Sequence, residues 1–248
     1  MILIRPYYEI ESYIYEDEIL KHIEKAARTC YKSEHQIGDF EKTKKFVAGV
    51  IKRGHETVIE HYSVSVRFII DRGISHELVR HRLAVYSQES TRYASYNKDQ
   101  FSNQITYIIP PWIDLKEGEY TIGNNITWKN PDGILIDIEV NDDIRDWLYS
   151  IGESEIYYMK LLNNYSWKPE QARSVLPNSL KTEILMTANL REWRHVFKLR
   201  ALGITGNPHP QMKEIMVPLL KEFKKRVPVI FDDLIIPKDN GRIYYNND

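Results

Sequence analysis

The chain is poor in the features that mark an oxidising compartment or a membrane. It has a single cysteine in 248 residues, Cys30, so no disulfide can form within it. No apolar run approaches the roughly 20 residues that span a bilayer. The opening segment, Met1–Pro6, is too short and wrongly built for a signal peptide. These absences predict a cytoplasmic protein with no membrane partner.

An excess of charge of one sign is also missing. Lys and Arg together number 34 and Asp and Glu 35, so no global positive field favours a nucleic-acid partner. The chain also lacks the Gly-rich loop with which Rossmann proteins hold dinucleotides. Aromatic side chains are plentiful, with 17 Tyr and 5 Trp, and they suit core filling, ring stacking or subunit interfaces.

Length and hydrophobic periodicity predict one α+β domain, with helices packed on a small, mostly antiparallel sheet. We expect this domain over 1–236, a polar C-terminal tail over 237–248, and an inserted hairpin or loop over 115–142 to which we assign no function. Strands are predicted within 1–14, 64–71 and 104–109. Helices are predicted over 19–27, 40–52 with Asp39 as N-cap, 143–166, 169–176, 178–202 ended by Gly203, and 212–223.

The stretch from Arg80 to Tyr93 is the most informative part of the sequence. An Arg guanidinium offers a planar fork of donors that suits phosphate and carboxylate oxygens, and short polar side chains add directed hydrogen bonds. This combination points to a phosphorylated, planar ligand, which means a nucleotide. The residues concerned are Arg80, His81, Arg82 and Arg92, with Ser87, Gln88, Ser90 and Thr91 among them.

A run of Arg and polar residues can also be an ordinary solvated helix face. Here apolar residues such as Leu78 and Val85 interleave with the charges, and a half-buried strand over 64–71 precedes them, so part of the segment should be buried. We expect a helix after a break at Gly73, with Ser75 as its N-cap. One side of that helix would carry Glu77, Arg80, His81 and Ala84.

Arg80-His81-Arg82, seven residues and then Ser90 match the signature of the flavin-dependent thymidylate synthases, and the sequence resembles that family well beyond the signature. The resemblance covers roughly 15–112 and 150–230. Its other blocks are Gly54-His55-Glu56-Thr57, Glu60-His61, Arg173-Ser174-Val175-Leu176-Pro177, Asn189-Leu190-Arg191, His195, Leu199 and Arg200.

The resemblance implies the reductive methylation of deoxyuridine monophosphate (dUMP) to thymidylate (dTMP). Methylenetetrahydrofolate would donate the carbon, and FAD reduced by NADPH would carry the hydride. Stabilising negative charge on the N3 side of the uracil ring activates carbon 5, and the family assigns this role to the position of Arg200. The resemblance also implies a homotetramer whose active sites are shared between subunits.

Site residues are carried over position by position. The catalytic residues expected from the resemblance are Arg200, Ser90 and His55, with His55 near the flavin and the folate. Ser90 is expected to donate a hydrogen bond rather than act as a nucleophile, because no general base lies beside it in the sequence. The expected dUMP contacts are Glu77, Leu78, Val79, Arg80, Gln88, Glu89, Ser90, Thr91, Arg92, Arg173 and Arg200. The expected FAD contacts are Thr57, Arg80, His81, Arg82, Gln88, Asn189, Leu190, Arg191 and His195, and His209 and Gln211 are weaker candidates.

Other functions remain open at this stage. The Arg80–Arg92 segment could belong to an RNA-binding module or a nucleotide sensor without flavin, or to a flavoenzyme acting on another pyrimidine nucleotide. Arg200 could be an ordinary cation at the end of a helix. A metal site is not expected, because His55-Glu56 and His61 lack the spacing of a zinc protease.

Cys30 could be the thiol nucleophile of a flavin-independent thymidylate synthase, but its place after a helix is more typical of a small buried thiol. If a flavin supplies the hydride and Arg200 polarises the ring, no thiol is needed. We therefore predict that Cys30→Ala keeps its turnover in a thymidylate-formation assay. Complete loss of turnover in a folded Cys30→Ala protein would refute this.

Overall fold

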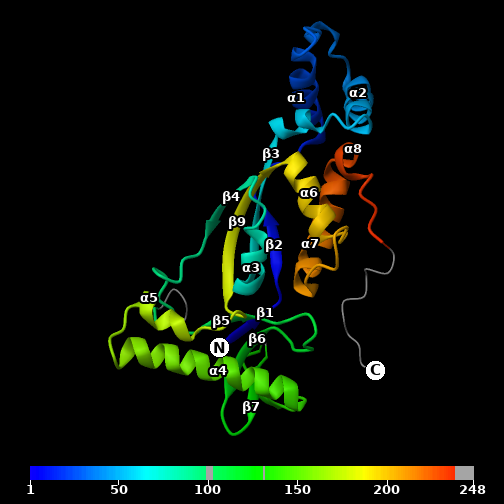
Figure 1. The fold of residues 1–248 in the computed structure, drawn as a ribbon. Coiled ribbons are helices and arrows are strands. Elements are labelled where there is room, and N and C mark those ends of the chain that lie inside the picture. The colour runs from blue at the N-terminus through cyan, green and yellow to red at the C-terminus, as the bar shows by residue number, and fades with distance from the viewer. Residues whose placement is uncertain (99–102, 131, 238–248) are drawn as a thin grey trace.

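The computed structural model describes residues 1–98, 103–130 and 132–237. Within these residues the strands form two sheets, one in the middle of the molecule and one near the end that carries α4 (Figure 1). The sequence predicted one small sheet, so this part of the prediction is wrong, although the α+β class is confirmed. The predicted polar tail, from residue 238 onward, lies outside the described residues.

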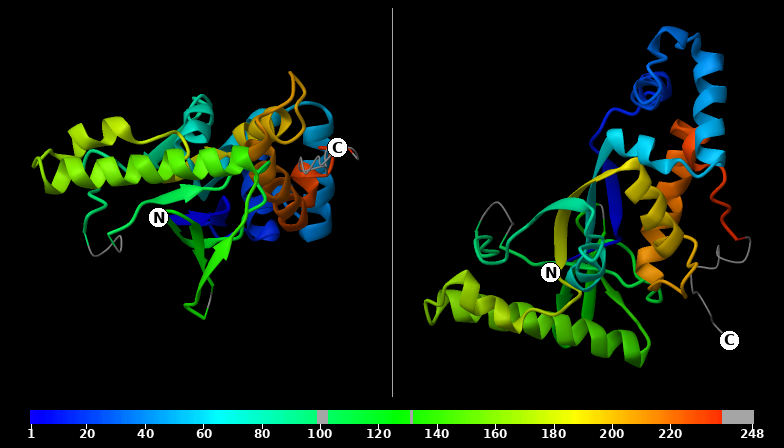
Figure 2. Two further views of the ribbon diagram at one scale, coloured as in Figure 1. Left: turned by 90° about the horizontal axis from the view of Figure 1, so that it is seen from below. Right: turned by 45° about the horizontal axis from the view of Figure 1, so that its top comes forward.

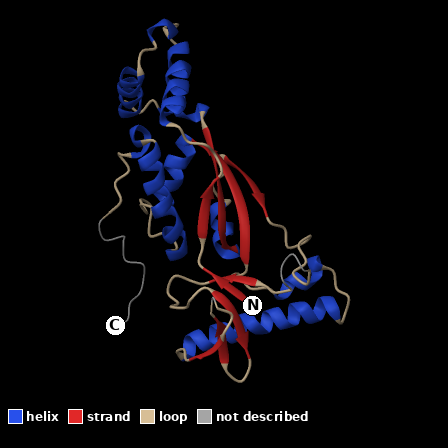
Figure 3. Ribbon diagram, turned by 180° about the vertical axis from the view of Figure 1, so that it is seen from behind, coloured by secondary structure: helices blue, strands red, loops and turns tan. Residues whose placement is uncertain are grey.

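The central sheet, whose strands are red in the middle of Figure 3, is antiparallel throughout. Its strand order is β2-β3-β9-β4. Its longest pairing joins β3 to β9 from Ser63↔Asn189 to Asp71↔Lys181. This ladder fixes the two ends of the sheet where the functional segments attach. The four strands are β2 (Tyr7–Ile10), β3 (Ser63–Asp71), β9 (Lys181–Asn189) and β4 (Ala84–Gln88).

The sequence predicted one helix from residue 178 to 202, and this is its largest error, because residues 181–189 form strand β9. Its alternate side chains, from Thr182 to Ala188, are buried, which is the period of two that a strand requires. The segment contains good helix formers such as Leu185 and Met186 and leads directly into a helix, α6 (Leu190–Arg200). Pairing with β3 and β4 on both sides overrides that local preference.

The second sheet has the order β5-β1-β6-β7-β8, with β1 and β5 parallel and the other neighbours antiparallel. The predicted hairpin over 115–142 supplies three of these strands; that this segment is an insertion stays a prediction. Helix α4 (Asp142–Asn163) runs across this end of the molecule (Figures 1 and 2). The strands are β1 (Ile2–Ile4), β5 (Thr106–Ile108), β6 (Gly118–Ile122), β7 (Ile126–Lys129) and β8 (Leu135–Ile138).

At the opposite end, α1 (Glu16–Thr29) packs against α2 (Phe40–Lys52) (Figure 1). Helix α2 has its predicted bounds, and its predicted N-cap is confirmed, because Asp39 accepts a hydrogen bond from the Lys42 N–H at 3.0 Å. Cys30, which was expected to be buried, is exposed just after α1. The short helix η1 (Glu34–Gln36) follows, and η2 (Glu56–His61) leads from α2 into β3.

The helix before the Arg-rich segment is shorter than predicted. Helix α3 (Arg72–Leu78) is capped by Asp71, which accepts from the Ile74 N–H at 2.6 Å, and not by Ser75. Ser75 is instead buried inside the helix and donates to the Arg72 carbonyl oxygen at 2.8 Å. Because α3 ends at Leu78, Arg80 and His81 lie in a turn between α3 and β4 rather than on a helix face.

Helices α6 and α7 (Pro210–Arg226) pack beside the central sheet (Figure 1). Their aromatic side chains belong to the larger of two buried apolar clusters. Trp193 and Phe197 of α6 lie with ring centroids 5.4 Å and 5.2 Å from Phe223 of α7. This packing holds α6 against α7, and the Trp193 indole N–H donates to the Val64 carbonyl oxygen of β3 at 3.0 Å, which ties α6 to the sheet. The remaining helices are α5 (Pro169–Ala172), η4 (Arg173–Val175) and α8 (Pro228–Phe231). In the described part of the chain, no helix is long and apolar enough to cross a bilayer.

Candidate active site

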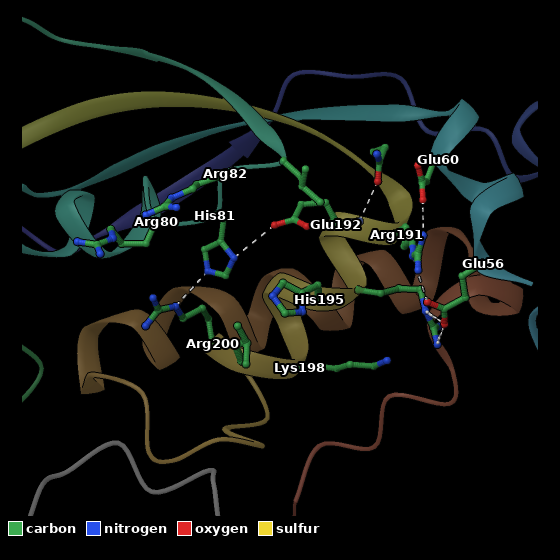
Figure 4. A pocket seen from close by; sticks show the side chains of 14 residues that line it. Glu56, Glu60, Arg80, His81, Arg82, Arg191, Glu192, His195, Lys198 and Arg200 are labelled. Carbon is green, nitrogen blue, oxygen red and sulfur yellow. Dashed lines mark hydrogen bonds and ion pairs between the residues drawn. The ribbon is translucent and has the colours of Figure 1, made fainter. Parts of the chain in front are cut away.

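A cavity of about 620 Å³ lies between η2, the turn after α3 and helix α6 (Figure 4). Its size falls within the range of about 300–1,000 Å³ that small-molecule sites usually have. Seven of the residues expected at the site line it: Arg80, His81, Arg82, Asn189, Arg191, His195 and Arg200.

The strand register brings these distant segments together. Ala84 at the start of β4 pairs with Ala188 near the end of β9, so the turn before β4 lies beside the first residues of α6. Asn189 starts that helix by accepting a hydrogen bond from the Glu192 N–H at 2.8 Å. Helical spacing then places Arg191, His195 and Lys198 along one side of α6, facing the cavity.

Arg200 is held by two partners from the segment around α3. Its Nε donates to His81 Nε2 at 3.1 Å. Its Nη1 lies 2.9 Å from Glu77 Oε2, and its Nη2 donates to the Glu77 carbonyl oxygen at 3.2 Å. Because a guanidinium has five N–H donors, two remain without a partner among the described residues, and Arg200 lines the cavity. The sequence predicted that Glu77 contacts the nucleotide, and this stays a prediction; in this structure Glu77 binds Arg200.

His81 is buried and neutral. Burial, with Arg200 and His195 nearby, lowers its pKa from 6.5 to about 4. Its Nδ1 faces Glu192 Oε1 at 3.5 Å, and burial raises the pKa of that carboxyl. The Tyr86 hydroxyl lies 2.8 Å from the carbonyl oxygens of His81 and Leu78, which fixes the turn. His81 therefore orients other groups and exposes little of its own ring to a ligand.

The cations of the cavity fall into two groups. Arg194 is buried and forms ion pairs with Asp233 at 2.6 Å and with Glu56 at 3.1 Å, so it ties α6 to η2 and to the segment after α8. Arg191 pairs with Glu60. The side chains of Arg80, Arg82 and Lys198 have no hydrogen-bond or salt-bridge partner among the residues that the structure describes. These three unpaired cations can hold an anionic ligand (Figure 4).

The second half of the Arg-rich segment lies elsewhere. Strand β4 separates it from the first half by about 13 Å, at roughly 3.3 Å per residue. There Arg173 of η4 donates to the buried Thr91 hydroxyl at 3.2 Å. Arg92 pairs with Glu170 at 3.0 Å, and the Ser90 hydroxyl accepts from the Arg92 N–H at 3.3 Å. Within one chain, Arg173 therefore does not join Arg80 and Arg200 at the cavity.

Gln88 and Glu89 are held by the protein itself. The Gln88 amide donates to the Ser75 hydroxyl at 2.9 Å and to the Thr182 hydroxyl at 3.2 Å. Glu89 forms an ion pair with Lys181 at 3.1 Å and accepts from the Tyr96 hydroxyl at 3.1 Å. These contacts anchor the start of the second half of the segment on β9.

The other expected residues lie off the cavity lining. The Leu78 and Leu190 side chains are in the apolar core, so a ligand could meet only their backbone, whereas Val79 is partly exposed. His55 and Thr57 are exposed at the start of η2, which contributes Glu56 and Glu60 to the lining instead. His209 contacts the Trp112 ring, and Gln211 donates to Asp71 at 2.9 Å.

Sequence reasoning missed several lining residues. The predicted helix over 178–202 already has Lys198 on the same side as Arg191 and His195, so its helical spacing could have identified Lys198. No local pattern marks the buried Glu192. The residues missed are Glu56, Glu60, Leu83, Glu192, Arg194, Lys198 and Leu199. Over the described residues, no group of three or more His, Cys, Asp or Glu side chains could hold a metal ion.

These features describe an α+β protein with a nucleotide-sized cavity rich in Arg. The model of the Thy1 family, described as thymidylate synthase complementing protein, matches residues 13–229. The chain therefore belongs to the Thy1 family.

Named relatives agree with this assignment. A flavin-dependent thymidylate synthase of Clostridium tetani is 31% identical over 220 residues, covering 85% of this chain and 80% of the relative. One from Mycobacterium sp. (strain JLS) is 29% identical over 228 residues, covering 88% and 82%. The crystal structure of a UMP/dUMP methylase, PolB of Streptomyces cacaoi, bound with 5-Br dUMP, shares the fold with a TM-score of 0.69 at 17% identity, covering 94% of this chain and 96% of PolB.

The depressed pKa of His81 predicts a pH dependence of stability. Unfolded, this imidazole takes up a proton as the pH falls below 6.5, whereas in the fold it stays neutral down to about pH 4. Stability from this group is therefore complete above pH 6.5 and should fall by up to about 3 kcal/mol between pH 6.5 and 4. His81→Asn, which cannot titrate, should lose this slope when unfolding free energies from urea titrations are compared. Parallel pH curves for the two proteins would contradict it.

Proposed function

We propose that this chain methylates dUMP reductively to dTMP, with methylenetetrahydrofolate as carbon donor and FAD, reduced by NADPH, as hydride carrier. The observation that carries the proposal is the arrangement of Arg200, which is fixed by His81 and Glu77 with two N–H donors left for a ligand. Arg200 lines the cavity together with the unpaired side chains of Arg80, Arg82 and Lys198, which suit a phosphorylated cofactor. The chain's family and its similarity to enzymes named flavin-dependent thymidylate synthase support the same reading.

Arg200 would act on the uracil ring. Its free donors can hydrogen-bond the N3 and O4 side of the base and stabilise the negative charge that develops there, which makes carbon 5 nucleophilic. Preorganisation matters because a guanidinium already held in place need not reorganise during the reaction. Cys30 lies just after α1 and is not among the residues lining the cavity, so the proposal uses no enzyme thiol.

The cavity fits a flavin dinucleotide by its chemistry. Arg80 and Arg82 are exposed, lie side by side at the turn after α3 and are unpaired within the described chain, so they can bind a pyrophosphate without breaking an ion pair (Figure 4). His195 and Asn189 line the wall beside them and can hydrogen-bond the rest of the cofactor. When bound, a reduced flavin would supply the hydride that completes the methyl group.

The second half of the Arg-rich segment would bind the nucleotide in a neighbouring subunit's site. Ser90, Arg92 and Arg173 lie together at the far end of β4, too far along the strand to reach the cavity of their own chain. A homotetramer in which this group meets the Arg200 of another copy would complete the site. Leu83, just before β4, and Val85, on β4, have exposed apolar side chains that suit burial in such an assembly.

Two other functions make different predictions. A nucleotide sensor or RNA-binding module would bind its ligand without flavin and would lose affinity steeply with salt. A flavoenzyme of another pyrimidine would be yellow but would not form thymidylate from dUMP.

The decisive experiment uses the purified full chain. A yellow protein that NADPH bleaches and air reoxidises, and that forms thymidylate from dUMP and methylenetetrahydrofolate, would support the proposal. UMP serves as the parallel substrate. A colourless protein that FAD cannot reconstitute would favour the binding module, and a yellow protein that methylates only UMP would favour the third function.

The shared site predicts complementation between inactive variants. Arg200→Ala and Arg173→Ala should each be inactive alone, because each damages every site of its own tetramer. Co-expressed, they should recover about a quarter of wild-type turnover per flavin, because one site in four receives both intact residues by random assembly. Mixing Arg200→Ala with Glu77→Ala, which alter the same half, is the control and should restore nothing. Failure of the first pair to recover activity in mixed oligomers would contradict the shared site.

A further inference from the structure

Glu192 is a buried carboxyl for which the proposed function has no use. It lies in the first turn of α6 and is only 5% exposed. Burying a carboxylate away from water is unfavourable unless it is paired. Its side chain faces one ring nitrogen, Nδ1 of His81, at 3.5 Å. His195 on the same helix and Tyr86 on β4 also act on this carboxyl electrostatically, and neither shares a hydrogen bond with it in the described structure.

The hydrogen-bond chemistry of Arg200 fixes the tautomer of His81. A guanidinium can only donate, so the Arg200 Nε contact at 3.1 Å requires Nε2 of His81 to be the acceptor. A neutral imidazole with an acceptor at Nε2 carries its proton on Nδ1. Glu192 Oε1 lies 3.5 Å from this nitrogen, so a carboxylate there can stabilise the tautomer with its proton on Nδ1.

The opposite tautomer would misplace Arg200. With the proton on Nε2, the His81 ring would present an N–H to the Nε–H of Arg200, and the guanidinium would have to move away. The other two contacts of Arg200 are both with Glu77. Arg200 would then turn about Glu77 and its two free donors would no longer point at a fixed place.

We propose that Glu192 is a positioning residue for Arg200, which acts by holding His81 in the Nδ1–H tautomer. The inference rests on the proposed function, because Glu192 would act only through Arg200, the residue that would polarise uracil. Glu192 touches no substrate or cofactor in this scheme. The order of contacts is Glu192 to His81, His81 to Arg200, and Arg200 to the base.

The kinetic test compares two replacements at one position. Glu192→Leu removes the acceptor while keeping the volume, and we expect kcat for thymidylate formation to fall by about a hundredfold with KM for dUMP little changed. Glu192→Gln keeps an oxygen that can accept from Nδ1–H, and kcat should fall by no more than about threefold. Flavin content, measured by absorbance, should be the same in both.

A second buried carboxyl controls for general destabilisation. Glu24 is fully buried, bound to Arg28 and Thr43, and does not line the cavity. Glu24→Leu should lower the melting temperature without changing kcat per flavin. If Glu192→Leu lost no more turnover than Glu24→Leu, or if Glu192→Gln lost as much as Glu192→Leu, the positioning role would be overturned.

The tautomer can be observed without any turnover. Solid-state NMR of protein labelled with ¹⁵N-histidine should show His81, assigned by its loss in His81→Asn, with its proton on Nδ1 in the wild type and with a mixture of tautomers in Glu192→Leu. An Nε2–H ring in the wild type would overturn this inference while leaving the proposed function intact. A wild-type protein that forms no thymidylate would overturn the proposed function itself and, with it, the purpose assigned to Glu192.

Discussion

The antiparallel pairing of β4 with β9 is the constraint on which the site depends. It sets Ala84 against Ala188 and Gln88 against Ile184, so the two halves of the Arg-rich segment leave the sheet at opposite ends of one strand. One end meets the start of α6 and forms the cavity. The other meets η4. Backbone hydrogen bonds therefore keep these two groups of residues apart within one chain, and this separation is the reason for proposing that another copy completes the site.

The arginines around the cavity differ in role: some bind other groups of the protein, and others are available to bind a ligand. Arg194 is buried and is bound by Asp233, Glu56 and the Ile230 carbonyl oxygen, and removing these partners would be costly because a buried charge would be left unpaired. Arg200 is only partly engaged, and Arg80 and Arg82 are unpaired in the described chain. Arginine therefore serves two purposes around the cavity. Those whose N–H donors are all bonded hold the fold, and those with unbonded donors can bind a ligand.

Short sequence patterns predicted the structure correctly where a side chain interacts only with residues close to it in the chain. Asp39 before an amphipathic run predicted both the start and the cap of α2, because an N-cap acts within three residues. They failed over 181–189, where residues that favour a helix in isolation form the central strand. Two neighbouring strands supply the pairing there, and no window of sequence contains them. Glu192 was missed for a related reason, since its partner His81 comes from a segment more than a hundred residues earlier.

The sequence by itself determined the chemistry available to this protein: the Arg-rich segment, the family it belongs to, and the α+β class, since these depend on residue identity and short-range periodicity. The tertiary structure alone decided which of those residues meet. It placed Arg80 and Arg200 at one cavity and Arg173 at another end of the sheet, and it placed a neutral His81 between Arg200 and Glu192. Strand register and burial act between residues distant in the chain, so they become defined only when the whole fold forms.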